Sequence, residues 1–173
     1  MIQNCNSGPD SSGKTRSDDE SMGNNMVVTQ NAAETRALGV RLAKKLKAGD
    51  VVLLEGELGA GKSELARGIA RGLGVTETVT SPSFTILNVY ESGSCPLYHF
   101  DWYRLESEEE LYELGMDEYL GGDGIALVEW PGRCPEAVPE DCLLIRLEAE
   151  SENTRRISSE SRGAFRTIIP DED

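Results

Sequence analysis

The sequence predicts a single α/β domain whose sheet mixes parallel and antiparallel strands and is flanked by helices. Three observations support this fold class. Residues 51–54 form a continuous apolar run, VVLL, which is typical of a strand buried on both faces of a sheet. A glycine-rich stretch and then a helical pattern follow it directly. Strand and helix patterns alternate early in the chain and strand patterns follow one another later, which indicates mixed strand directions.

The chain divides by composition into a body and two ends. Residues 1–25 are rich in Ser, Asn, Gly and Asp and poor in apolar side chains, so we expect a disordered polar N-terminal tail. Residues 26–169 are expected to form the one folded domain, which suits a total length of 173 residues. Residues 170–173 read PDED and are expected to be a solvated acidic C-terminal end.

The domain is expected to open with an apolar run at residues 26–28 and then a helix. Asn31, followed three residues later by Glu34, is a helix N-cap pattern. Apolar residues recur at helical spacing between residues 38 and 46, and Gly49 is expected to end this helix.

The rest of the domain is predicted to contain two more helices and several short strands. One helix follows the glycine-rich stretch to about Leu73, and an acidic helix is expected from about Ser107 to Leu114. The first two of the remaining strand candidates are separated by Ser-Gly-Ser and are expected to form a hairpin. These candidates lie at residues 84–90, 97–101, 125–128, 143–147, 155–158 and 164–169.

The charge of the chain is strongly acidic, with a formal net value of −14. Residues 1–26 contribute −2 and residues 148–173 contribute −3, so −9 belongs to the central body. A surface of this sign repels the phosphate backbone of nucleic acids. We therefore expect no DNA binding, and a role in an RNA pathway is expected to run through a protein partner.

Composition also argues against a membrane span and a zinc site. No apolar run approaches the roughly 18 residues that a membrane span needs, and the N-terminal region lacks the apolar core of a signal peptide, so we expect a cytoplasmic protein with no membrane association. The four cysteines form no CxxC pair and His99 is the only histidine. Reduced thiols are therefore favoured over a zinc site.

The glycine-rich stretch carries the clearest chemical signal. Residues 56–63 read GELGAGKS and match every fixed position of the phosphate-binding loop (P-loop) pattern GxxxxGK[ST]. Glycines let backbone N–H groups approach phosphate oxygens, Lys62 adds a full positive charge, and the Ser63 hydroxyl is placed to ligate magnesium. The pattern predicts that a nucleoside triphosphate contacts Glu57, Leu58, Gly59, Ala60, Gly61, Lys62, Ser63 and Glu64.

Two carboxylates are predicted to complete a triphosphate-hydrolysing site. Glu129 and Asp101 each directly follow an apolar strand candidate. Glu129 stands where the magnesium-binding acid of a P-loop protein is expected. We therefore predict Lys62, Asp101 and Glu129 as catalytic residues, with Ser63 and Glu129 holding the metal.

For several neighbouring residues, two interpretations stay open. Strand alternation places His99 on the same face as Asp101, so His99 either orients that acid or is an ordinary strand residue. Arg104 is interpreted as a local ion-pair partner, with phosphate neutralisation as the alternative, and Tyr103 as a packing residue. The acidic run at residues 106–118 is either a solvated helix face or a docking surface for a basic partner.

Taken together, these motifs resemble the TsaE family, whose older name is YjeE. The resemblance covers roughly residues 29–147. It rests on the P-loop and on stretches that occur in the family's order, of which YHFDWYR and VEWP are far more selective than the P-loop alone. These stretches are ET at 34–35 with LG at 38–39, LEG at 54–56 leading into the P-loop, SPSFT at 81–85, YHFDWYR at 98–104 and VEWP at 128–131.

The resemblance implies an ATPase that binds ATP and Mg²⁺ and supports threonylcarbamoyladenosine formation on tRNA. It implies homologues of TsaD and TsaB as partners, with tRNA met only through that complex. By the same resemblance, residues 81–85 are a switch-like loop near the γ-phosphate, Asp101 and Glu129 are essential acids, and Trp130 lies beside the nucleotide. Glu64 stands where the family commonly has a second threonine, so it is expected to weaken nucleotide binding unless it points away or meets a cation.

Two other functions stay open from the sequence. A small-molecule or nucleotide kinase would need an acceptor-binding region or an arginine-rich lid, and neither is evident after the P-loop helix. A nucleotide-dependent binding switch with negligible hydrolysis would use the same motif, and measured hydrolysis is what separates it from an ATPase.

Overall fold

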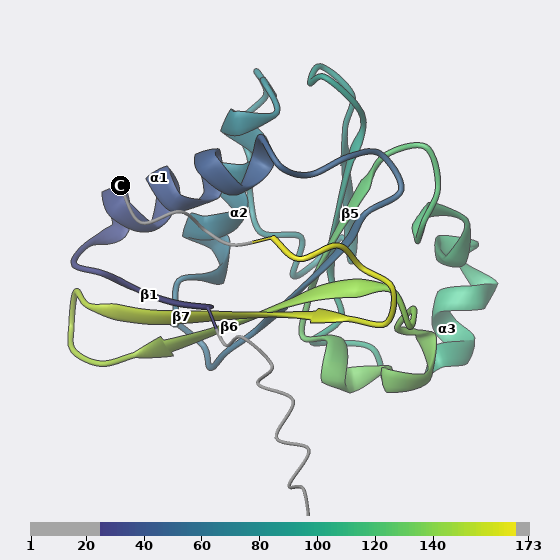
Figure 1. The fold of residues 1–173 in the computed structure, drawn as a ribbon. Coiled ribbons are helices and arrows are strands. Elements are labelled where there is room, and N and C mark those ends of the chain that lie inside the picture. The colour runs from purple at the N-terminus through teal and green to yellow at the C-terminus, as the bar shows by residue number, and fades with distance from the viewer. Residues whose placement is uncertain (1–24, 169–173) are drawn as a thin grey trace, which may run out of the picture.

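The computed structural model describes residues 25–168 and shows a seven-stranded sheet with helices on both faces (Figure 1). The strand order is β1-β7-β6-β2-β5-β4-β3. The strands are β1 (Asn25–Thr29), β2 (Val51–Glu55), β3 (Leu87–Tyr90), β4 (Leu97–Asp101), β5 (Ile125–Glu129), β6 (Cys142–Ala149) and β7 (Arg155–Arg162). Strands β6, β2, β5 and β4 are parallel, whereas β1–β7, β7–β6 and β3–β4 pair antiparallel. The predicted mixed sheet and the predicted β3–β4 hairpin are confirmed.

Two helices cover one face of the sheet and shorter ones cover the other. Helices α1 (Ala32–Ala43) and α2 (Lys62–Gly72) pack together, and α3 (Glu108–Glu113) lies on the opposite side (Figure 1). Three 3-10 helices complete the secondary structure of the described residues: Met116–Tyr119, Pro131–Arg133 and Pro135–Ala137.

The start of α1 follows the expected capping pattern. Asn31 Oδ1 accepts the backbone N–H of Glu34 at 3.0 Å, and the Glu34 carboxylate accepts the backbone N–H of Gln30 at 2.7 Å. These contacts satisfy donors that the first turn of a helix otherwise leaves without partners.

Strand β2 is buried on both faces, as its unbroken apolar run predicts. Side chains alternate along a strand, so Val52 and Leu54 join the core under α1 and α2, while Val51 and Leu53 join the core on the α3 side. The burial on both sides fixes this strand in the middle of the sheet, directly before the glycine-rich loop.

The parallel register brings functional positions to one edge of the sheet. Asp101, the last residue of β4, pairs with Glu129, the last residue of β5. Strand β2 lies beside β5 and ends at Glu55, immediately before the loop. Open α/β sheets bind ligands at the carboxyl ends of their strands, and here the loop and both acids meet at that edge.

One predicted strand is absent and the bounds of several others differ, as in β7, which continues past the predicted end at residue 158 to Arg162. No strand forms over residues 164–168, because the chain leaves the sheet at a turn that contains Gly163 with φ 57° and Ile168 then packs into the core under α1 and α2. Strand β3 begins at Leu87 and not at residue 84, since a turn precedes it in which the Ile86 N–H donates to Pro82 O at 2.7 Å.

The first helix ends earlier than predicted. Helix α1 stops at Ala43, and the chain then tightens into turns in which Lys45 N–H donates to Leu42 O and Leu46 N–H to Ala43 O. Gly49 lies beyond these turns with φ 89°. The predicted N-terminal tail (residues 1–25) and the acidic end (residues 170–173) lie outside the described residues, apart from residue 25, which begins β1.

Candidate functional site

The P-loop joins the end of β2 to the start of α2. Gly59 and Gly61 have φ of 81° and 104°, in the left-handed region that glycine adopts without steric cost. Gly56 lies so close to β6 that a Cβ there would be 2.5 Å from the backbone oxygen of Leu147. The loop therefore turns sharply against the sheet and presents the N-terminus of α2, where backbone N–H groups attract anions.

Lys62 is buried at the first position of α2. Its Nζ donates to the backbone oxygens of Gly56 at 2.5 Å and Glu57 at 3.0 Å, and it lies 4.1 Å from the centre of the Trp130 ring. Burial lowers the pKa of Lys62, although the carboxylates of Glu129, Asp101 and Glu57 oppose that shift. The ammonium is thus held in a desolvated position that favours an incoming anion.

A pocket of about 600 Å³ lies in front of this lysine. It unites the predicted catalytic residues Lys62, Asp101 and Glu129 with the predicted metal ligand Ser63. The pocket is lined by Glu57, Leu58, Gly59, Gly61, Lys62, Ser63, Glu64, Ser81, Ser83, Asp101, Tyr103, Glu129 and Trp130.

The two acids in the pocket are held by different donors. Asp101 accepts the Ser83 hydroxyl at 2.7 Å through Oδ2 and the Tyr103 backbone N–H at 2.9 Å through Oδ1. Glu129 Oε1 lies 2.8 Å from Nε2 of His99. His99 therefore contacts Glu129 and not Asp101, the acid that strand alternation had suggested.

Trp130 enters the pocket from a strained backbone. Its φ of 59° and ψ of 47° lie in the left-handed region, which is rare for a bulky side chain and costs on the order of 1–3 kcal/mol. Its ring packs against the tilted Tyr103 ring, with ring centres 5.0 Å apart, and lies against the Lys62 ammonium. Tyr103, which sequence reasoning assigned to packing, instead stands half exposed at the pocket mouth.

Glu64 meets two cations. Its carboxylate pairs with the guanidinium groups of Arg36 on α1 and Arg67 on α2. Arg67 Nε also donates to the backbone oxygen of Val79 at 3.3 Å, on the chain that leads to residues 81–85. The negative charge of Glu64, which was expected to weaken nucleotide binding, is therefore balanced by Arg36 and Arg67. Neither arginine was predicted from the sequence to lie near the site.

Arg104 and Arg155 also differ from expectation. Arg104 lies 4.5 Å from the centre of the Phe84 ring, and no ion pair is found for it among residues 25–168. Arg155 was expected only as a strand residue, yet its Nη2 donates to Gly59 O at 3.2 Å. It lines a small groove of about 130 Å³ that also borders Glu64.

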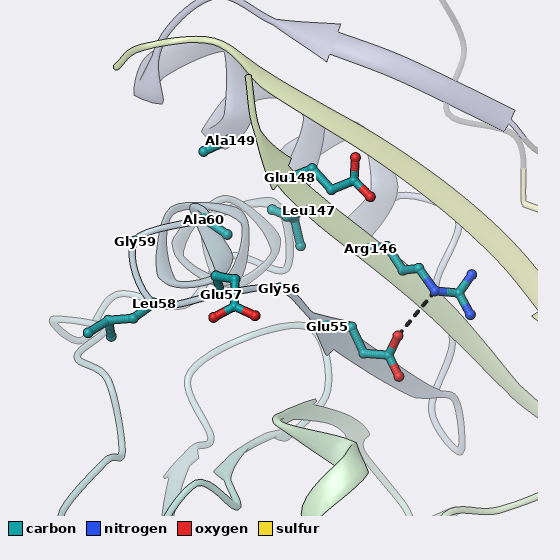
Figure 2. A pocket seen from close by; sticks show the side chains of 10 residues that line it. All are labelled: Glu55, Gly56, Glu57, Leu58, Gly59, Ala60, Arg146, Leu147, Glu148 and Ala149. Atoms are coloured by element: carbon teal, nitrogen blue, oxygen red, sulfur yellow. Dashed lines mark hydrogen bonds and ion pairs between the residues drawn. The ribbon is translucent and has the colours of Figure 1, made fainter. Parts of the chain in front are cut away.

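A second hollow of about 500 Å³ lies on the β6 side of the P-loop (Figure 2). Within it, Arg146 on β6 donates from Nε to the Glu55 carboxylate at 3.1 Å. Ala60, predicted to contact nucleotide, is buried and lines this hollow instead of the first pocket. The hollow lacks every predicted catalytic side chain, whereas Lys62, Asp101 and Glu129 all line the pocket described first.

The residues present suit a magnesium ion that is shared with phosphate. Across residues 25–168, no group of three or more His, Cys, Asp and Glu side chains is arranged to hold a metal by itself. Magnesium in phosphate sites usually keeps several waters and takes only one or two protein ligands. Ser63 and Glu129, which line the same pocket, match that requirement.

The fold and this site define a P-loop α/β protein, in which a buried parallel strand, β2, leads through a glycine-rich loop into a helix, and acids end the next two strands of the sheet, β5 and β4. Residues 29–157 match the family described as "Threonylcarbamoyl adenosine biosynthesis protein TsaE". The chain belongs to that family.

Similar proteins agree over most of the domain. The tRNA threonylcarbamoyladenosine biosynthesis protein TsaE of Bacillus subtilis is 45% identical over 130 residues, which cover 75% of this chain and 81% of the relative. The protein of the same name from Treponema pallidum is 39% identical over 131 residues, or 76% of this chain and 96% of the relative. The crystal structure of Bacillus subtilis YdiB matches with a TM-score of 0.71 at 39% identity, covering 81% of this chain and 86% of that chain. The family expected from the sequence is confirmed.

One further property of the chain concerns membranes. Among residues 25–168, no helix has the length and apolar character needed to cross a bilayer.

Proposed function

We propose that this protein is the ATP-binding and ATP-hydrolysing component of the machinery that makes threonylcarbamoyladenosine on tRNA. Membership of the TsaE family supports the pathway. The observation that carries the ATPase assignment is the meeting of Lys62 and Ser63 with Asp101 and Glu129 in one pocket.

Each group in the pocket has its own role in the proposed hydrolysis. Backbone N–H groups of the P-loop and the Lys62 ammonium bind the phosphates. The Ser63 hydroxyl and Glu129 would hold magnesium, which would supply positive charge beside the phosphoryl group. Asp101 and Glu129 also accept hydrogen bonds from the attacking water and orient it. The Trp130 ring covers one side of Lys62 and keeps water from that contact.

We propose that homologues of TsaD and TsaB dock over the mouth of this pocket. Leu58 and Phe84 are 91% and 85% exposed, and Tyr103 is half exposed. Leu58 and Tyr103 line the pocket, and Phe84 follows Ser83, which also lines it. Exposed apolar side chains that gather at one place mark protein contacts. The acidic body supports contact with tRNA only through these partners.

We also place the protein in the cytoplasm with reduced cysteines. The free thiols of Cys95, Cys134 and Cys142 support that placement, because reducing compartments keep thiols unpaired.

The test is ATP hydrolysis in the presence of magnesium, by the chain alone and with purified TsaD and TsaB homologues. We expect low turnover that rises with the partners. The Lys62→Ala variant should lose nucleotide binding, whereas Glu129→Ala should bind nucleotide and lose hydrolysis.

Three outcomes would contradict the proposal. Turnover that responds to a small acceptor and not to the protein partners would indicate a kinase. Tight nucleotide binding without hydrolysis, even with the partners, would indicate a binding switch. Normal hydrolysis by Glu129→Ala would remove this residue from its role and leave Asp101 as the metal-binding acid.

A further inference from the structure

His99 is a buried polar residue that the proposed phosphate chemistry does not use directly. It lies on β4, is 1% exposed, and places Nε2 2.8 Å from Oε1 of Glu129, which is also buried. The two residues come from neighbouring parallel strands, β4 and β5. His99 does not line the 600 Å³ pocket, whereas Glu129 does.

The hydrogen bond determines which ring nitrogen carries the proton. A carboxylate only accepts hydrogen bonds, so Nε2 of His99 is the donor and, in the neutral ring, Nδ1 is the acceptor. Nδ1 is buried and has no hydrogen-bond partner among the described residues. A buried polar atom without a partner is unfavourable, so the position of the ring satisfies Nε2 and leaves Nδ1 without a hydrogen bond.

The hydrogen bond to His99 also gives the two carboxylate oxygens of Glu129 different surroundings. Oε1 is engaged by His99, and no hydrogen bond to Oε2 is found within residues 25–168. Oε2 is therefore the oxygen that Glu129 can offer to a ligand in the pocket. Asp101 differs, since both of its oxygens accept hydrogen bonds from Ser83 and from the backbone of Tyr103.

We propose that His99 is a positioning residue that holds the Glu129 carboxylate in one orientation for hydrolysis, without touching the nucleotide. The kinetic part of this inference rests on the proposed ATPase function. The geometric part, the Nε2–H tautomer bonded to Glu129, does not depend on that function. Groups that orient a metal-binding side chain typically affect activity about 10- to 100-fold when they are removed.

Two variants separate positioning from simple core packing. His99→Gln keeps an N–H donor near the position of Nε2, whereas His99→Leu keeps a buried apolar volume and removes the donor. We expect both to bind nucleotide like the natural protein. We expect kcat to fall about tenfold or more in His99→Leu with little change in KM, and to be largely restored in His99→Gln.

The tautomer is measured independently by nitrogen NMR of the imidazole, which gives one set of signals because His99 is the only histidine. We expect a protonated Nε2 and an unprotonated Nδ1 in the natural chain, and a loss of this preference in Glu129→Ala. An Nδ1–H tautomer, or the same spectrum in Glu129→Ala, would overturn the positioning role.

Some kinetic results would also contradict the positioning role. Unchanged kcat in His99→Leu, or equal losses in the Leu and Gln variants with equal losses of thermal stability, would show that the ring only fills space. If the natural protein with its partners hydrolyses no ATP, the ATPase proposal fails, and the NMR result still decides whether His99 holds Glu129.

Discussion

At the scale of single residues, Lys62 links binding to stability. Its ammonium is almost fully buried, and its bonds to Gly56 O and Glu57 O and its contact with Trp130 replace water only in part. The lowered pKa of Lys62 means that the folded state disfavours its charge relative to the unfolded chain. A phosphate in the pocket supplies the missing negative charge, so the site is unfavourable for the empty protein and favourable for the occupied one.

Replacing Lys62 with methionine is therefore expected to remove nucleotide binding without lowering stability. Because the folded pKa lies below the ordinary value of 10.5, the charge is unfavourable to folding at neutral pH, and this effect fades as the pH rises toward 10.5. Denaturant unfolding should show Lys62→Met at least as stable as the natural chain at pH 7, with the difference shrinking near pH 10. A less stable variant at pH 7 would contradict this explanation.

Glu64 illustrates how neighbours decide the effect of a charge. Its ion pairs with Arg36 and Arg67 are partly exposed, so we expect them to add little to folding but to matter for a nearby anion. The double variant Arg36→Met/Arg67→Met should weaken magnesium–ATP binding about tenfold, or about 1.4 kcal/mol, since it leaves a carboxylate and removes two cations.

The matched control for that variant adds Glu64→Gln. If the uncompensated carboxylate causes the loss, the triple variant should regain a large part of the affinity in calorimetric titrations. A triple variant as weak as the double one would show that the arginines act on the nucleotide themselves.

At the scale of elements, glycines set the distance between α1 and α2. A Cβ at Gly68 would lie 2.2 Å from the backbone oxygen of Arg36, and one at Gly39 would lie 2.5 Å from the backbone oxygen of Leu65. Glycine lowers helix propensity, so within an isolated helix these residues are unfavourable. Close packing of the two helices explains their presence and holds α2, and with it the P-loop, against the sheet.

Gly68→Ala is accordingly expected to destabilise the protein by about 3 kcal/mol, because backbone atoms cannot move aside as a flexible side chain can. Thermal unfolding measures the effect. Gly132→Ala is a suitable control, since a Cβ at Gly132 meets no atom within 4 Å, and it should change the melting temperature little. Equal melting temperatures for the two variants would show that the helices separate without cost.

At the scale of the whole molecule, an acidic domain presents apolar side chains around one pocket. The charge keeps nucleic acid away, while Leu58, Phe84 and Tyr103 offer a surface that a protein can cover. A partner that docks there would lie directly over the proposed site of hydrolysis. Its position would then explain the stimulation of turnover that we expect.

Phe84→Ser is expected to reduce partner-stimulated hydrolysis several-fold, because Phe84 is 85% exposed and its loss removes contact area and not core packing. Thermal stability should stay unchanged. Met26→Ser serves as the control, since Met26 is also exposed but lies on β1, at the opposite edge of the sheet from β3. Equal stimulation of both variants by the partners would show that the docking surface does not include Phe84.

Much of the candidate site could be predicted from sequence because its signals are local. The P-loop pattern, the apolar strand before it and the acids that end two later strands each lie within a few neighbouring residues. The wrong predictions also concern short segments of the chain. Residues 164–168 have the composition of a strand, but the chain turns out of the sheet at Gly163 and Ile168 packs into the core under α1 and α2 instead.

By itself the sequence determined the α/β class and the family, and it identified the P-loop pattern and the two candidate acids, since these depend on residue types at fixed short spacing. Only the tertiary structure decided that His99 hydrogen-bonds to Glu129, that Arg36 on α1 pairs with Glu64 on α2, and that Arg155 reaches the loop at Gly59. Most of these contacts join residues distant along the chain. They arise from strand order, parallel register and the close packing of α1 on α2, which depend on the free energy of the whole fold and on no local pattern.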